Sequence, residues 1–221
     1  MRKRVINPMA DVFKYLAISI LFMFIGFGFG VAFVPKEVVY YGNFIIMLLM
    51  LMTLIMAIFS RKSIIPRSFS MNFVYLFTFI DGILMYPVLQ LYLQDLGVNV
   101  VINVLLTTII LFGVLSYVSN KKEPGHYLGW GQTLFIFLIV TIISFIINIF
   151  IGSSAASIFI SMFSIVVFSG YILYDISAIK DDISRGYITD KNDLSVHVLD
   201  LYLDFINIFL DLLNILWELK D

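Results

Sequence analysis

Seven apolar runs follow one another along almost the whole 221-residue chain, and each is long enough to cross a lipid bilayer. A membrane-spanning helix needs about 20 predominantly apolar residues. The mean hydropathy is +1.02 and only 13% of the residues are charged, a balance that no soluble domain of this size requires. Membrane-spanning strands are not indicated, because they need only about ten residues of alternating polarity. The sequence therefore predicts an all-α integral membrane protein with seven transmembrane helices in a single domain, residues 1–221. The predicted helices cover approximately residues 13–34, 39–60, 71–93, 98–118, 130–151, 155–178 and 196–217.

Basic residues concentrate in the N-terminal tail and in alternate connections between the predicted helices: Arg2, Lys3, Arg4, Arg61, Lys62, Arg67, Lys121, Lys122, Lys180, Arg185 and Lys191. The other connections carry only one basic residue, Lys36, which is followed by Glu37. Cytoplasmic loops of membrane proteins carry an excess of lysine and arginine, so the N-terminus is predicted to be cytoplasmic. The first apolar run is too long for a cleaved signal, and the lack of long tails suits a bacterial plasma membrane. If the seventh helix spans fully, the C-terminus lies outside, and if that helix is re-entrant, the C-terminus returns to the cytoplasm. The sequence leaves both arrangements open.

The last predicted helix carries acidic residues at membrane depth. Such a residue is disfavoured by roughly 2.5–3.5 kcal/mol on insertion scales, so it usually faces a partner, a water-filled cavity or an ion path. Residues spaced by three, four and seven share one face of a helix. One polar stripe therefore contains Asp200, Asp204, Asn207, Asp211 and Asn214. A helix that is apolar on its other sides is expected at the centre of a bundle. The two asparagines are favoured as hydrogen-bonding contacts between helices, whereas the carboxylates favour a functional site.

A further carboxylate, Asp175, lies about one turn from the cytoplasmic end of the sixth predicted helix. At 1.5 Å per residue, Asp204 lies about 12 Å and Asp200 about 6 Å from the cytoplasmic start of the seventh helix, so either one can face Asp175. Two carboxylates in contact do not both remain ionised, and they titrate as a unit. Arg61, at the end of the second predicted helix, is at the matching level, and its guanidinium would hold one acid at a time. This arrangement predicts a pH-responsive latch.

Other site chemistries have little support in the sequence. The chain contains no cysteine, and neither of its two histidines has a zinc-binding spacing. His197 lies seven residues before Asp204, on the same helix face, and is a candidate to tune the latch. Gly26, Gly28 and Gly30 suggest close helix packing or flexibility rather than a phosphate loop. We expect no cofactor, no confidently assigned metal site and no nucleic-acid partner. The expected partners are the lipid bilayer, protons and calcium.

Three stretches of the chain resemble the Bax inhibitor-1 family, also called the transmembrane Bax inhibitor motif family, and specifically its bacterial branch. They are Ile172-Leu-Tyr-Asp175, Leu201-Tyr-Leu-Asp-Phe-Ile-Asn-Ile-Phe209 and Phe73-Val-Tyr-Leu-Phe-Thr-Phe-Ile-Asp-Gly-Ile-Leu-Met-Tyr-Pro87. The resemblance implies a seven-helix fold with the last helix central, and a pH-sensitive calcium leak across the membrane. It also implies that the aspartate pair is Asp175 and Asp204, rather than Asp200.

The resemblance further implies an arginine latch from the second helix. This role falls best on Arg61, with Lys62 and Arg67 as the alternatives. The chain departs from the family pattern at Asp81, near the middle of the third predicted helix, where a small residue is expected. Asp81 either adds a pore carboxylate or is a protonated acid bonded to a neighbour, and both interpretations remain open.

The leading functional prediction is a leak for cations, above all calcium. Calcium is a hard cation that takes oxygen ligands, and acidic side chains in a pore select cations. Transient calcium binding is therefore expected near Asp175 and Asp204. The alternative from another class is a membrane regulator without transport activity that binds a protease or an envelope partner. An intramembrane aspartyl protease also needs two aspartates on adjacent helices, but its Gly-x-Gly-Asp motif is replaced here by Leu201-Tyr-Leu-Asp204. We therefore predict that the protein is not an enzyme.

Overall fold

The computed structural model of the chain describes residues 7–35 and 68–220, and these residues form helices and connecting loops without a strand. The α-helices are α1 (Pro8–Phe33), α3 (Met71–Asp95), α4 (Val98–Asn120), α5 (Gly131–Ile151), α6 (Ser154–Ser184) and α7 (Ser195–Glu218), and a short 3₁₀ helix, η2 (Leu128–Trp130), precedes α5. The helix predicted over residues 39–60 and the three candidate latch residues, Arg61, Lys62 and Arg67, lie outside the described residues. The all-α class is confirmed for the part of the chain that the structure describes.

Five of the described helices are long and apolar enough to cross a membrane. They are α1, α3, α4, α6 and the unit formed by η2 and α5. The α7 helix is not among them, although it has 24 residues. Over a membrane-spanning length it carries more charged residues than those five helices, because it contains Asp200, Asp204 and Asp211. The described residues therefore support five of the seven predicted spans.

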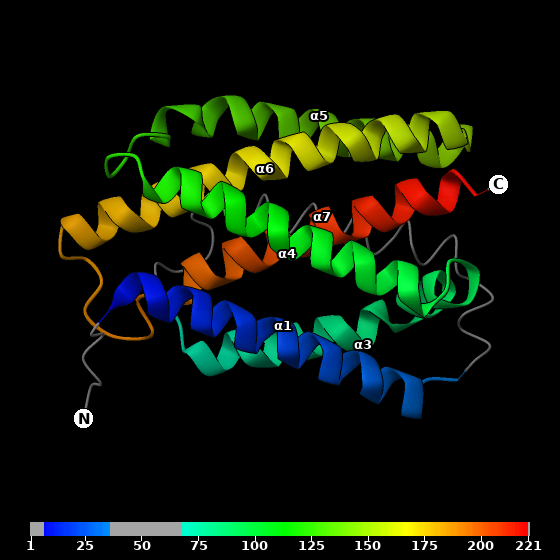
Figure 1. Cartoon of the computed structure of the whole chain (residues 1–221), viewed down its shortest axis with the longest axis horizontal. Helices are drawn as coiled ribbons and strands as arrows, with labels where there is room; N and C mark the ends of the chain where they lie inside the picture. Colours follow the sequence, from blue (N-terminus) through cyan, green and yellow to red (C-terminus); the bar gives the residue numbers. More distant parts are fainter. Residues whose placement is uncertain (1–6, 36–67, 221) are drawn as a thin grey trace.

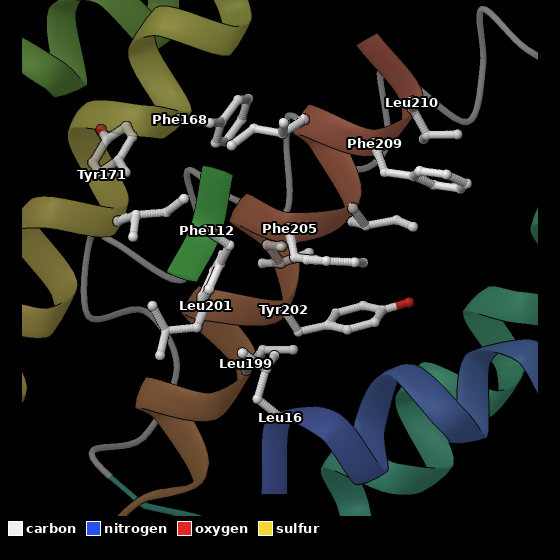
Figure 2. Close-up of a cluster of buried hydrophobic side chains, with 14 of the residues drawn as sticks. Leu16, Phe112, Phe168, Tyr171, Leu199, Leu201, Tyr202, Phe205, Phe209 and Leu210 are labelled. Carbon is white, nitrogen blue, oxygen red and sulfur yellow. The ribbon is translucent and has the colours of Figure 1, made fainter. Parts of the chain in front are cut away.

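The centre of the described bundle is α7. In Figure 1 it runs between α5 and α6 on one side and α1 and α3 on the other, with α4 crossing in front. It packs against α6, α1, α4 and α3, and its side chains from Leu201 to Asp211 are all buried. Figure 2 shows α7 side chains leaving the helix on several sides, with Phe205 directed at Phe112 of α4. The rings of that pair lie 6.2 Å apart. The central position expected for the last helix is thus observed.

Two glycines bring α1 and α3 into backbone contact. A Cβ atom on Gly26 would lie 2.0 Å from the carbonyl oxygen of Phe79, and one on Gly82 would lie 1.9 Å from that of Met23. No larger residue fits either position without moving a helix. Gly28, on the same helix as Gly26, has no atom within 4 Å of its would-be Cβ. Close packing therefore depends on particular glycines rather than on the whole glycine run.

The structure extends α6 beyond its predicted end. The apolar run stops near residue 178, but the helix continues through Ser184. Arg185 caps it and pairs with Asp181 at 2.8 Å, and Gly186 follows with a positive φ of 74°. Apolar composition marks the membrane-embedded part of a helix, whereas these charged residues continue the same helix outside it.

Candidate functional site

Two contacts fix the alignment of α6 and α7. Near the start of α7, His197 Nε2 lies 3.1 Å from Asp182 Oδ2. Near the other end of α7, Asn214 Nδ2 donates a hydrogen bond of 3.0 Å to Ser161 Oγ. The two helices are therefore antiparallel, and each level of α7 can be matched to a level of α6.

Asp175 and Asp204 lie at nearly the same level of these packed helices. Counted from the His197–Asp182 contact toward the Asn214–Ser161 contact, Asp175 lies about one third of the way along α6. One third of the way along α7 between the same contacts falls one or two residues before Asp204. At 1.5 Å per residue, the two positions differ in level by about 3 Å or less. Their exposed fractions are 3% for Asp175 and 0% for Asp204. Asp200, one turn nearer the start of α7, is only half-buried, so Asp204 matches Asp175 better in burial.

The connection from α4 to α5 is fixed to α6 beside Asp175. Ser119 Oγ donates to the carbonyl oxygen of Leu173 at 2.7 Å, and the backbone N–H of Tyr127 donates to Ser177 Oγ at 3.1 Å. Lys180 Nζ reaches the carbonyl oxygen of Asn120 at 2.7 Å. These bonds attach the loop to the α6 turns on either side of Asp175.

The start of α3 is attached to the segment that leads into α7. The backbone N–H of Phe69 donates to Ser195 Oγ at 3.0 Å, and that of Met71 donates to Asn192 Oδ1 at 3.1 Å. The second bond satisfies a backbone donor in the first turn of α3, where such donors have no partner within the helix itself, and the first bond holds the residue before the N-cap. Segments 121 and 126 residues apart in the sequence therefore meet at the Asp175 end of the bundle.

Asp81 is bonded to a neighbouring helix. Its side chain is 7% exposed, and Tyr202 donates its phenolic hydrogen to Asp81 Oδ2 at 2.5 Å. Tyr202 lies on α7, so this bond joins α3 to the central helix. Asp81 is thus bonded to a neighbouring helix, while its protonation and its role in a pore stay predictions. Sequence reasoning missed Tyr202, because a tyrosine inside an apolar run gives no pairing signal.

The remaining polar residues of the α7 stripe have different partners. Asn207 Nδ2 donates to the carbonyl oxygen of Leu203 in its own helix at 2.7 Å. Asn214 instead joins α7 to α6, as the sequence predicted for it. Asp211 is 4% exposed and interacts with serine hydroxyls of α6. His197 contacts Asp182 of α6, a partner that the sequence did not indicate.

Metal-ligating side chains do not gather among residues 7–35 and 68–220: no group of three or more histidine or acidic residues there is arranged to hold a metal ion. The buried acids are instead separated along α7 and between its neighbours.

A central helix with buried acids, enclosed by apolar helices of membrane-spanning length, defines a polytopic membrane protein. A model of the family described as inhibitor of apoptosis-promoting Bax1 matches residues 5–221. The chain therefore belongs to the Bax inhibitor-1 family.

Bacterial membrane proteins are among the relatives of the chain. It is 34% identical over 129 residues to an uncharacterized protein of Helicobacter pylori, an alignment that covers 58% of this chain and 53% of that protein. It is 31% identical over 146 residues to an uncharacterized membrane protein of Vibrio cholerae, with 65% of each chain covered. An uncharacterized membrane protein of Streptococcus pyogenes is 28% identical over 174 residues, covering 78% of this chain and 71% of the relative. The chain spans about half the length of the Helicobacter protein. These relatives and the apolar helices indicate a membrane location.

Proposed function

We propose that the protein is a pH-sensitive leak for calcium, gated by Asp175 and Asp204. The observation that carries this proposal is the burial of both carboxylates at nearly the same level of two packed helices. An intramembrane acid in such a position is a functional-site hypothesis by default. Family membership supports the assignment, because the resemblance implies the same pair.

The gate works through the charge of the pair. In the closed state the two carboxylates share one proton, and Arg61 holds the remaining charge. When the proton leaves, two like charges repel in a site from which water is excluded. Two unit charges about 4 Å apart interact by about 4 kcal/mol at an effective dielectric constant of 20. That repulsion loosens the start of α7 against α6 and opens the bundle at this end.

Calcium is the cation that best suits these oxygen ligands, because it is a hard cation that binds carboxylates. The chain has no cysteine that would favour a soft metal. Each level of the bundle offers a calcium ion only a few carboxylates, so the ion is bound weakly. Weak binding lets the ion leave as readily as it enters.

The test is calcium flux into liposomes that contain the purified protein, measured across about pH 6–8, a range in which coupled buried carboxylates titrate. We expect the native chain to show pH-dependent flux and both Asp175→Asn and Asp204→Asn to lose that dependence. Asp200→Asn is the matched control on α7, and it keeps the native profile. If Asp200→Asn abolished the dependence while Asp204→Asn did not, the assignment of the pair would be wrong. Absence of flux in a folded, inserted native protein would refute the leak and favour a regulator without transport activity.

The gate is proposed to face the cytoplasm, together with the N-terminus. The basic residues Lys121, Lys122 and Lys180 lie at this end, as the positive-inside rule requires. Since the natural chain has no cysteine, single-cysteine variants report sidedness directly. We expect Glu123→Cys to react with an impermeant thiol reagent only from the cytoplasmic side and Ser154→Cys only from the opposite side. The reverse pattern would overturn this orientation.

A further inference from the structure

A second polar cluster lies in the half of the bundle remote from Asp175 and Asp204. It is built around Asp211 of α7, which is 4% exposed. Ser161 and Ser164 of α6, each 2% exposed, donate hydrogen bonds to the Asp211 carboxylate. Asn214 Nδ2 donates in turn to Ser161 Oγ at 3.0 Å. The cluster is thus a connected set of oxygen-bearing side chains between α6 and α7.

A hydroxyl group from a third helix indicates that this cluster binds a ligand. Tyr92 of α3 is fully buried, and its hydroxyl oxygen has no hydrogen-bond partner among the described residues. Its ring packs edge-on against Trp217, with the centroids 6.1 Å apart, and its hydroxyl lies within electrostatic range of Asp211. Buried polar groups in native proteins are almost always hydrogen-bonded to protein or to a bound species. The orphan hydroxyl therefore marks a place where something else binds.

The charge of the cluster indicates what that species is. Asp211 receives hydrogen bonds from neutral hydroxyls, and no lysine, arginine or histidine among the described residues is found to neutralise it. An ionised carboxylate in a dry site needs a compensating charge. Carboxylate, hydroxyl and amide oxygens together are ligands for hard cations such as calcium. A water molecule would satisfy Tyr92 but would supply no compensating charge when Asp211 is ionised.

The position of Asp211 relates this cluster to the gate. Seven residues separate Asp211 from Asp204, so both lie on one face of α7 about 10 Å apart along its axis. Beyond Asp211, the end of α7 is attached to α3, because Trp217 Nε1 donates to Asp95 Oδ2 at 2.8 Å. The cluster is therefore enclosed between the gate and a fixed helix end.

We propose that Asp211, Ser161, Ser164 and the Tyr92 hydroxyl form a transit site for a partly dehydrated calcium ion, on the far side of the bundle from the gate. This inference rests on the proposed leak and adds to it a second binding position, which is distinct from the aspartate pair. With one carboxylate and several neutral oxygens, the site binds calcium weakly and releases it.

The first test measures binding without flux. Terbium is used as a luminescent substitute for calcium in detergent-solubilised protein, with Trp217 as the light-absorbing donor. The chain has two tryptophans, so a Trp130→Phe background leaves Trp217 as the only one. We expect saturable terbium emission that calcium displaces. Because Asp211→Asn removes a charged ligand, the terbium concentration at half-saturation should rise by at least about tenfold. Emission that is unsaturable, or equal in Asp211→Asn and its parent, would overturn the site.

The matched control is a second tyrosine on α3. Tyr86 is also buried, at 2% exposed, but it is not part of the cluster. Tyr92→Phe should weaken terbium binding several-fold, whereas Tyr86→Phe should leave it unchanged. If Asp211→Asn does not fold, Ser164→Ala serves in its place with the same expected direction. Equal effects of the two tyrosine substitutions would mean that Tyr92 only fills space, and the inference would fail.

The second test separates this inference from the proposed function. In liposomes, Asp211→Asn should lower calcium flux at every pH while the pH at half-maximal flux stays native. Native flux with no effect of Asp211→Asn would refute the transit site and leave the leak intact. Terbium binding that depends on Asp211 in a native protein without flux would refute the leak and leave a cation site.

Discussion

Replacing Gly82 with alanine tests the backbone contact between α1 and α3. The new Cβ atom would lie 1.9 Å from the carbonyl oxygen of Met23, whereas real Cβ atoms essentially never approach a neighbour closer than 3.0 Å. One of the two helices must therefore move by about 1 Å. Because the obstacle is backbone, no side-chain rotation relieves it. Overpacking costs about 1–3 kcal/mol, and we expect Gly82→Ala to lie at the upper end, about 3 kcal/mol less stable than the native chain.

The measurement is the free energy of unfolding in mixed micelles, titrated with a denaturing detergent. A loss of about 3 kcal/mol is a large fraction of a typical total stability of 5–15 kcal/mol. The matched control is Gly28→Ala. The new methyl group there meets no atom within 4 Å, and alanine is favoured over glycine in a helix by up to about 1 kcal/mol. The control should therefore be neutral or slightly stabilising.

A double substitution gives the result that would refute this reasoning. Gly26→Ala meets the carbonyl oxygen of Phe79, so it is expected to separate the same two helices as Gly82→Ala. Once one methyl group has separated them, the second costs less, and the double variant should lose less stability than the sum of the single ones. Strict additivity, or a Gly82→Ala variant as stable as Gly28→Ala, would show that the helices are not held at backbone contact.

Three further substitutions test individual contacts. Tyr202→Phe removes the hydrogen bond to Asp81 and leaves a buried carboxyl without that donor, so the free energy of unfolding should fall by about 1–3 kcal/mol; an unchanged value would mean that the bond does not stabilise the fold. Arg185→Gln breaks an exposed pair at the end of α6, which is expected to leave thermal stability unchanged, because exposed ion pairs contribute little; a lowered melting temperature would contradict this. His197→Gln removes the contact with Asp182, and the pH profile of calcium flux should shift, whereas a native profile would exclude His197 from the gate.

Helix positions were largely predictable from the sequence, because apolar runs report where helices cross the bilayer. The predicted run 71–93 corresponds to Met71–Asp95, and the predicted run 98–118 to Val98–Asn120. The end of α6 was not predictable in this way. Residues from Lys180 to Ser184 are polar except for Ile183, and hydropathy does not distinguish a helix that continues into water from a loop.

The candidate site was predictable only as a face of a helix. The stripe on α7 follows from residue spacing, but the partner of each residue does not. Asn207 and Asn214 have the same side chain and lie on the same face, but Asn207 Nδ2 donates to a carbonyl oxygen of α7 and Asn214 Nδ2 donates to serines of α6. The Tyr202–Asp81 hydrogen bond and the electrostatic effect of Asp211 on Tyr92 connect residues more than 100 positions apart, and such proximity depends on tertiary packing that a local pattern does not contain.

The two ends of the α6–α7 interface differ in chemistry, and this difference makes the two proposals separable. At one end α6 presents the buried carboxylate of Asp175 and the carboxylate of Asp182, which contacts His197 of α7. At the other end it presents serine hydroxyls, which hold Asn214 and Asp211 through hydrogen bonds. In the proposed mechanism, loss of the proton shared by Asp175 and Asp204 opens the first end, and calcium then passes the Asp211 cluster at the second. Substitutions at the charged end should move the pH at which flux begins, and substitutions at the serine end should change how much calcium passes once flux has begun.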